Sequence, residues 1–479
     1  MKQILLLAGL LASMNAMAFC GFYVAKADAK LFNKTSEVII VRNGEKTTIT
    51  MSSDFQGEVK DFAMVVPVPV VLQKEQVKII EHALFRKMDD YSGPRLVSYN
   101  DEDPCYVPPT YNHREGDMVF CSASGASMTL GAFSSVNQVV KIEAKYSVGE
   151  YDILVLSSKE SGALETWLIQ NGYKIPEGAK EVLDPYIKSN MKFFVVKANS
   201  DEMKRLKTDK LRPIQISFNS PKFMLPIRLG MANATDAQDM VVYAFSKVGR
   251  IEVTNYRTVE MPTGQNVPLF VEQKFGPFYK DLYTRTYKKE GKNAVMLEYA
   301  WDISGSVSQF CDPCVGPPPM LQDLMTLGVD WVEQYHGGYS GQIYFTRLHT
   351  TYDRAHFPQD LMFQETPNKT NYQARYVLHR PASSSFDCEK ASTYLAGLQK
   401  RRQEELKNMH DLAGWDMAQY ADYPAEFNQY IKKTPNKTTK QGSFLPDITR
   451  ENFPLVLLSL ISLAAVIFTL TRRPKHIKT

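Results

Sequence analysis

Cysteines are the residues of this 479-residue chain whose spacing most resembles a chemical site. Cys311 and Cys314 form a Cys-Asp-Pro-Cys motif, and thiol pairs at this spacing serve both redox enzymes and metal sites. A reactive thiol needs a pKa lowered by a helix N-terminus or a nearby cation. Here Asp312 adds negative charge, and residues 315–319 (VGPPP) postpone the next helix. We therefore interpret the pair as a structural disulfide, with redox chemistry and metal binding as the alternatives.

The other four cysteines predict further disulfide bonds, because an even number of cysteines in an exported chain is typical of a disulfide framework. Cys105 and Cys121 enclose a loop that contains prolines and glycine, so we expect this pair first. Closing that loop is worth on the order of 3 kcal/mol in the chain-entropy model. Cys20 and Cys388 then form the last predicted pair, and sequence distance alone guides this connectivity.

A second group of polar residues follows a predicted strand. His349 and His356 enclose Asp353 and Arg354, residue types that hold metal ions or bind acidic ligands. Alternation along an edge strand also exposes such residues without any function. We favour this second interpretation and keep the four residues as a candidate binding cluster.

Signatures of the common catalytic classes are missing from the sequence. It contains no G-x-S-x-G, no H-E-x-x-H and no G-x-x-x-x-G-K-[ST] motif. The sequence therefore assigns no catalytic residue, no metal ligand and no cofactor.

The charge distribution excludes nucleic acid as a partner. The net charge is +4, but Lys2 and the four basic residues after residue 471 supply five positive charges, so the part between them carries −1. A nucleic-acid binder needs a clustered basic surface that releases counterions from phosphates. No such run lies between the two ends.

Strand-like runs dominate the chain and predict an α+β fold. β-branched and aromatic segments bounded by turn residues recur without the regular strand-helix alternation of a doubly wound sheet. Asn43-Gly44 suits a tight hairpin turn between the first two runs. The runs are SEVIIV, KTTITM, DFAMVVPVPVV, QVVKIEAKYSV, YDILVL, MKFFVVKA, RPIQISF, MVVYAF, RIEVTNY, NAVMLEYAW and GQIYFTRLHTTY.

Helices are predicted in three places by apolar residues at helical spacing. The first covers about residues 74–88. In the second, Leu164, Trp167 and Leu168 share one face, and we expect all three to be buried, with Trp167 as a core anchor. The third covers about residues 391–413, where a strict heptad pattern fails at Arg402 and Glu405 and favours a helix packed on the body over a coiled coil.

Both ends of the chain predict export. Residues 1–18 have a basic start, an apolar stretch and an Ala-x-Ala pattern, as in a cleavable secretory signal. Residues 453–471 are uncharged and long enough to cross a bilayer as one helix. Basic residues follow at once, which places the last eight residues in the cytoplasm and the body outside it.

These observations divide the chain as follows: signal peptide 1–18, N-terminal β-rich domain 19–158, α+β segment 159–262, β-rich segment with the Cys-Asp-Pro-Cys turn 263–390, amphipathic helix 391–415, linker 416–452, transmembrane helix 453–471 and cytoplasmic tail 472–479.

Several separate motifs resemble those of the bacterial family called Domain of Unknown Function 2330. They are CGFYV, FQGEVKDFAMVVPVPV, YDILVL with WLIQNGYKIP and FFVVKA, LRPIQISF with LPIRL, CDPC near Trp301, and FTRLHTTYDR with DLMFQ. The resemblance spans about residues 19–415 in the right order. It implies an exported, often membrane-anchored envelope protein, and it brings no established reaction or catalytic residues.

Two hypotheses follow from the sequence. The one we favour is a non-enzymatic, disulfide-braced protein of the bacterial inner membrane, which binds an envelope protein or a cell-wall component outside the cytoplasm. The alternative is a periplasmic thiol-disulfide oxidoreductase that uses Cys311 and Cys314.

Overall fold

A nine-stranded mixed sheet is the central element of the computed structural model. The structure describes residues 22–23, 35–52, 63–106, 140–171, 173, 179–206, 211–232, 237–304, 318–335, 338–383 and 386–426. Eight strands follow the order β14-β16-β19-β12-β2-β3-β10-β5, and β21 pairs with β16. Their bounds are β2 Thr35–Asn43, β3 Lys46–Ser52, β5 Val77–Ile79, β10 Ile214–Asn219, β12 Gln238–Ser246, β14 Arg257–Glu260, β16 Ala294–Asp302, β19 Tyr344–Tyr352 and β21 Tyr372–Gln373.

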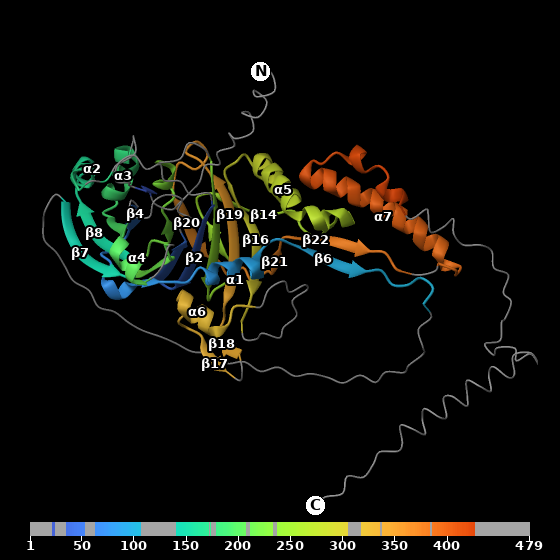
Figure 1. Cartoon of the computed structure of the whole chain (residues 1–479), viewed down its shortest axis with the longest axis horizontal. Helices are drawn as coiled ribbons and strands as arrows, with labels where there is room; N and C mark the ends of the chain where they lie inside the picture. The colour runs from blue at the N-terminus through green and yellow to red at the C-terminus, as the bar shows by residue number, and fades with distance from the viewer. Residues whose placement is uncertain are drawn as a thin grey trace, which may run out of the picture. The chain divides into compact units, whose positions relative to one another are not determined.

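A five-stranded antiparallel sheet packs on one face of the central sheet (Figure 1). Val38 and Ile40 of β2 point into the core between the sheets, whereas Ile39 and Val41 point to the opposite, outer face. This two-residue period lets one strand serve two cores. The second sheet has the order β1-β4-β9-β8-β7, with bounds β1 Phe22–Tyr23, β4 Ala63–Val68, β9 Lys192–Ala198, β8 Tyr151–Ser158 and β7 Val140–Val148.

Helices cover the remaining faces of both sheets. α2 (Ser161–Gln170) and α3 (Ala179–Lys188) bury Leu164, Leu168 and Leu183 against the five-stranded sheet. α1 (Ala83–Ser92) and α6 (Leu321–Leu327) pack on the outer face of the central sheet.

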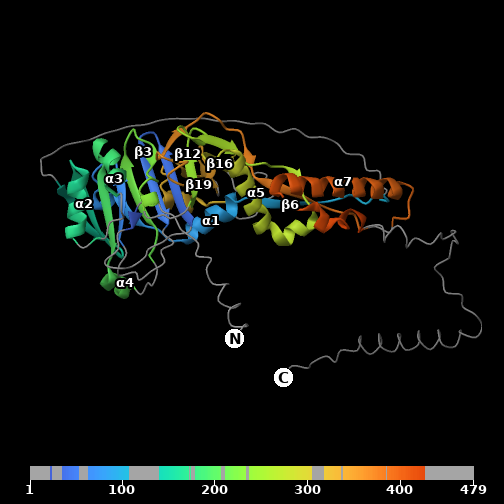
Figure 2. The same ribbon diagram turned by 90° about the horizontal axis from the view of Figure 1, so that it is seen from above.

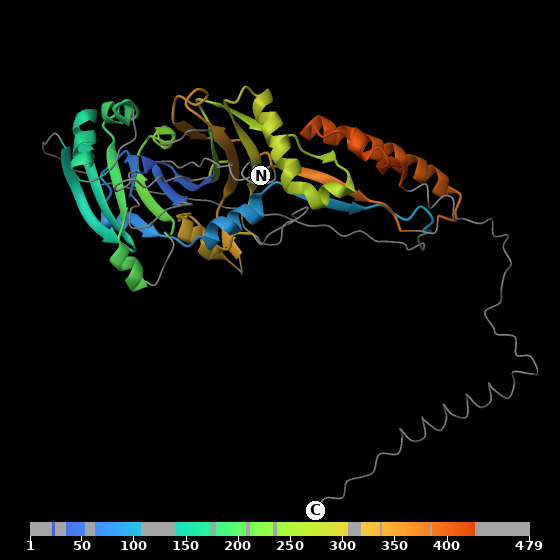
Figure 3. The same cartoon turned by 45° about the horizontal axis from the view of Figure 1, so that its top comes forward.

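A helical layer lies beside this body, as Figures 2 and 3 show for α5 and α7. α5 (Phe275–Lys289) contacts α7 (Lys390–Ala413), and both pack on a small sheet of order β15-β22-β6. The bounds of its strands are β15 Gln265–Asn266, β22 Arg375–Arg380 and β6 Arg95–Asn100. The remaining elements are β11 Met224–Leu225, β13 Ile251–Val253, β20 Leu361–Glu365, β17 Glu333–Tyr335, β18 Gly338–Ser340, α4 Ser200–Leu206 and the 3-10 turns η2 Lys74–Gln76, η3 Gly230–Ala232, η4 Leu269–Lys274, η5 Met417–Tyr420 and η6 Tyr423–Ala425.

The α+β class and the strand-rich body agree with the sequence analysis, but one predicted helix is wrong in part. Residues 74–88 contain the turn η2, the strand β5 and only the start of α1. Val77 pairs with Ile216 of β10, so sheet pairing overrides the helical pattern there. The turn between β2 and β3 is also shifted by one residue: it contains Gly44 and Glu45, with Gly44 at a positive φ of 60°.

Trp167 corrects the predicted core of α2. Leu164 and Leu168 are fully buried as expected, but Trp167 is only half-buried and packs at the margin of that core. The central sheet takes strands from all three predicted segments between residues 19 and 390.

The predicted signal (1–18), transmembrane segment (453–471) and tail (472–479) lie outside the described residues. Within the described part, no helix combines the length and the apolar character that a membrane span needs.

Candidate functional site

A β-bulge on β16 lies at the centre of a densely bonded polar cluster. Opposite β19, Leu297 pairs with Leu348 and Tyr299 with Arg347, which leaves Glu298 as an extra residue between the two pairs. A bulge re-aims side chains, and here it turns Glu298 to the outer face of the sheet together with Tyr299. The sequence alternation alone would not place two successive residues on one face.

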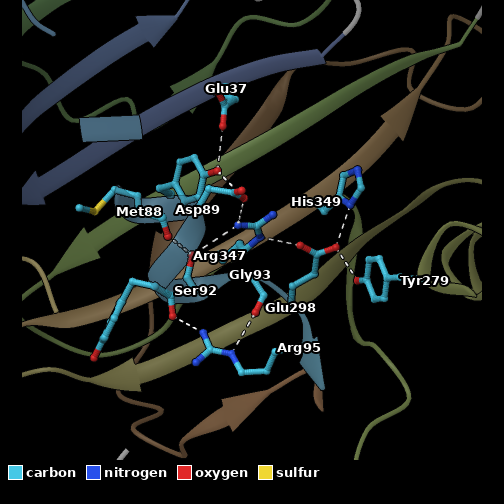
Figure 4. Close-up of polar contacts among 12 residues, drawn as sticks. Glu37, Met88, Asp89, Ser92, Gly93, Arg95, Tyr279, Glu298, Arg347 and His349 are labelled. Carbon is cyan, nitrogen blue, oxygen red and sulfur yellow. Dashed lines mark hydrogen bonds and ion pairs between the residues drawn. The ribbon is translucent and has the colours of Figure 1, made fainter. Parts of the chain in front are cut away.

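Glu298 is fully buried and accepts hydrogen bonds at both carboxylate oxygens (Figure 4). Arg347 Nε donates to Oε2 at 2.6 Å, and the Tyr279 hydroxyl donates to Oε1 at 2.6 Å. His349 Nδ1 lies 2.8 Å from Oε1. Burial alone would raise the pKa of Glu298, but the adjacent His349 and Arg347 lower that pKa to about 2.

Arg347 connects this carboxylate to helix α1. Its Nη1 lies 2.6 Å from Asp89 Oδ1, and its guanidinium lies 5.3 Å from the centre of the Tyr243 ring. The Tyr243 hydroxyl oxygen lies 2.9 Å from Glu37 Oε1 and 3.2 Å from Asp89 Oδ1. Burial raises the pKa of Glu37. The cluster therefore joins β2, β12, β16 and β19 to α1.

His349 extends the cluster toward α5. Its ring stacks on Tyr283 with 4.1 Å between the ring centres. Thr351 Oγ1 donates to the Asp239 carboxylate, and it lies 3.1 Å from the Tyr283 hydroxyl oxygen. A carboxylate that holds one ring nitrogen of a histidine orients the ring, as seen in both structural and catalytic sites. His349 contacts Glu298 of β16 and Tyr283 of α5, so the arrangement suits a brace between β16, β19 and α5.

Comparison with protein families provides the identification. The family model described as "Uncharacterized protein conserved in bacteria (DUF2330)" matches residues 14–364, well over half of the chain. The chain belongs to this family. No curated protein and no solved structure matches it.

The matched region of this DUF2330 protein includes Glu298, Arg347 and His349, and it ends before α7 begins.

The predicted binding cluster is divided in the structure. His349 contacts Glu298, whereas Asp353 and His356 pair with each other at 2.8 Å in the loop after β19. Arg354 donates through Nε to the Met231 carbonyl at 3.1 Å. No group of three His, Cys, Asp or Glu side chains that could hold a metal ion occurs among the described residues.

Sequence reasoning missed Glu298, Arg347 and Asp89. A usable signal existed for Glu298, since a single carboxylate interrupts the apolar run AVMLEYAW. A charge within a buried strand requires a partner of opposite charge, and Arg347 on the neighbouring strand is that partner.

The disulfide pairing differs from the prediction. Cys105 bonds to Cys388, with Cα atoms 5.5 Å apart and a sequence separation of 283. The predicted Cys105–Cys121 and Cys20–Cys388 pairs are therefore wrong. Sequence distance misled here because parallel pairing of β6 with β22 brings residues 105 and 388 to the same end of one sheet. The remaining cysteines, Cys20, Cys121, Cys311 and Cys314, lie outside the described residues.

Proposed function

We propose that this protein is exported, anchored in the bacterial inner membrane by residues 453–471, and acts by binding an envelope protein or a cell-wall component through its body. The Cys105–Cys388 bond is the observation that carries the proposal, because disulfides form and persist in oxidising compartments outside the cytoplasm. The apolar start and the apolar, basic-flanked end of the sequence support the same address.

The polar cluster around Glu298 favours a structural role over a catalytic one. Glu298 uses both oxygens on donors from its own chain, and Arg347 is engaged by Glu298 and Asp89. Buried groups satisfied in this way hold structural elements together. A catalytic carboxylate, by contrast, has to reach a substrate atom within hydrogen-bond distance.

Reporter fusions test the address. An enzyme reporter that is active only outside the cytoplasm should be active when fused before Phe453 and inactive when fused after Thr479. A cytoplasm-active reporter at the same two positions is the control and should give the opposite pattern. Activity of the first reporter only after Thr479 would overturn the proposed topology.

Thiol measurements test the binding role against the oxidoreductase alternative. Insulin reduction by the purified chain should not exceed the background rate, and the Cys311→Ser, Cys314→Ser double variant should behave like the parent. Clear insulin reduction that disappears in the double variant would favour the oxidoreductase.

A further inference from the structure

A polar groove lies on the outer face of the central sheet, away from the Glu298 cluster. Its floor is formed by every second side chain of β3 and β10, which point to the outer face. Their neighbours Ile49 and Ile216 point into the core. Cross-strand pairs place Lys46 opposite Asn219 and Thr48 opposite Ser217. The floor thus presents hydroxyl and amide groups from two paired strands.

Two walls border the groove, which stays open to solvent and has a volume of about 440 Å³. One wall contains Met325 of α6, Gly328 and Asp330, and the other contains Glu75, Gln76 and Lys78 of η2 and β5. Gly328 has a φ of 102°, and a Cβ there would lie 2.9 Å from Thr48 Oγ1. Glycine therefore allows the end of α6 to contact the floor. The volume is in the range of pockets that bind small ligands, roughly 300–1,000 Å³.

Buried polar groups fix the shape of the floor. Gln215 is 3% exposed and donates to Thr50 Oγ1 at 2.9 Å and to the Thr326 carbonyl at 3.1 Å. Thr48 Oγ1 lies 3.0 Å from Ser217 Oγ. These bonds connect β3, β10 and α6, so the groove is preformed and would not need to order itself on binding.

The charges of the lining residues cancel. Lys46 pairs with Asp330 at 2.5 Å, and Lys78 and Glu75 contribute one charge of each sign. An anionic ligand such as a phosphate would require a net positive site. Uncharged groups dominate the rest of the lining: Thr48, Gln76, Gln215, Ser217 and Asn219.

Met325 adds an apolar contact at the rim. Its side chain is 53% exposed, although large apolar side chains are normally placed out of water. A thioether adapts its shape to irregular apolar surfaces. A ligand that matches this groove therefore combines many hydroxyl or amide groups with small apolar faces, and it carries no net charge.

We propose that this groove binds a neutral glycan. Sugar hydroxyls donate and accept hydrogen bonds as the solvent-accessible side chains Gln76, Ser217 and Asn219 of the lining do, and the apolar face of a pyranose ring suits Met325. This inference deepens the proposed function by naming the ligand class of the body. The groove contains no residue of the proposed membrane segment, so a binding test of the groove does not depend on that segment.

Calorimetric titration of the full-length chain in detergent with chitotriose and with maltotriose tests the proposal. The two sugars separate glycans that carry acetamido groups from those that carry hydroxyls alone, and binding of either one supports the proposal. We expect Met325→Glu and Asn219→Ala each to weaken binding at least tenfold without a change in melting temperature.

Met320→Glu is the matched control, because Met320 is 64% exposed beside the same helix and does not line the groove. This variant should bind like the parent. Failure of the parent chain to bind either sugar, or binding that survives both groove variants, would overturn the proposal. Binding of a neutral peptide in place of the sugars, with the same sensitivity to Met325→Glu, would also overturn it. The reporter fusions do not depend on either result, so the address and the ligand class can fail separately.

Discussion

Arg347 Nε and Glu298 Oε2 lie 2.6 Å apart, and both side chains are buried. Removing two charges from water costs several kcal/mol per ion, so such a pair is stable only when further hydrogen bonds satisfy its remaining groups. Tyr279, His349 and Asp89 meet that requirement. The pair is therefore a node that fixes the relative positions of β16, β19, α5 and α1.

Replacing Glu298 by glutamine should destabilise the fold by about 3–5 kcal/mol, since it leaves the buried Arg347 without one of its two carboxylates. Urea unfolding followed by tryptophan fluorescence measures this change. Glu333→Gln is the control, because Glu333 is exposed on β17 and should tolerate the change. Equal stability of the two variants would show that Glu298 does not brace the sheet.

The Arg347–Glu298 pair also predicts that part of the folding stability is lost at low pH. The pKa of Glu298 in the folded chain is about 2, below its usual value, so its ionised form favours the folded state. Its contribution is fully present above about pH 4.5 and is lost as the pH falls toward 2. The stability difference between the parent and Glu298→Gln should therefore shrink across this window. A constant difference between pH 5 and pH 3 would contradict the assignment.

The Cys105–Cys388 bond should be found as a single cross-linked peptide pair when the unreduced protein is digested and analysed by mass spectrometry. Cys121→Ser should leave this pair intact. The long loop between the two positions predicts a stabilisation of about 5 kcal/mol from chain entropy, and measured values are typically about 2–4 kcal/mol. The Cys105→Ser, Cys388→Ser double variant should melt at a lower temperature than the parent. Recovery of a Cys105–Cys121 peptide would refute the pairing.

Trp167→Ala should cost only about 1–2 kcal/mol, less than the roughly 3–5 kcal/mol expected for a fully buried tryptophan. Its half-buried position at the edge of the α2 core is the reason. Leu164→Ala on the same helix should cost about 2–5 kcal/mol, because Leu164 is completely buried. Thermal melts of both variants give the comparison, and a larger loss for Trp167 would reverse this ranking.

Glu405 on α7 predicts a stability that falls with rising pH, which is opposite to the effect of Glu298. Burial raises the pKa of this carboxyl to about 7, although Tyr423, Arg401 and Arg402 act to lower it. The folded state then holds a proton that the unfolded state releases, so stability should fall as the pH rises from about 4.5 to 7. Glu405→Gln should flatten this slope, whereas Glu404→Gln on the exposed side of α7 should not. Denaturant unfolding at pH 5 and pH 8 distinguishes the two variants.

The local spacing of apolar residues predicted those helices and strands that bury one continuous apolar face. Six strands of the central sheet (β2, β3, β10, β12, β16 and β19), α2 and α7 follow from alternation and helical spacing, because these signals reflect which side chains a single element buries. The short strands β5, β14 and β21 were not predicted. Arg402 and Glu405 interrupt the heptad of α7, and the structure explains them: Arg402 stacks on Tyr423, and Glu405 accepts from its hydroxyl. Both residues therefore contact Tyr423, which follows α7 along the chain.

Long-range partners were beyond the sequence pattern. The β-bulge at Glu298 depends on the register between β16 and β19, and no local signal sets a register. The disulfide depends in the same way on the pairing of β6 with β22, two strands separated by most of the chain. His349 was singled out from its neighbours in sequence, whereas its actual partner Glu298 is contributed by another strand.

The covalent link between β6 and β22 also determines how the body resists a mechanical load. Tension applied beyond Glu426 would first peel η6 and α7, and it would reach Cys388 only after that helix had unravelled. There the sulfur bridge passes the load to Cys105 as well. Because β6 and β22 are parallel, both strands are then loaded from the same end. They would be displaced together instead of sliding past each other, so the hydrogen bonds between them carry no shear.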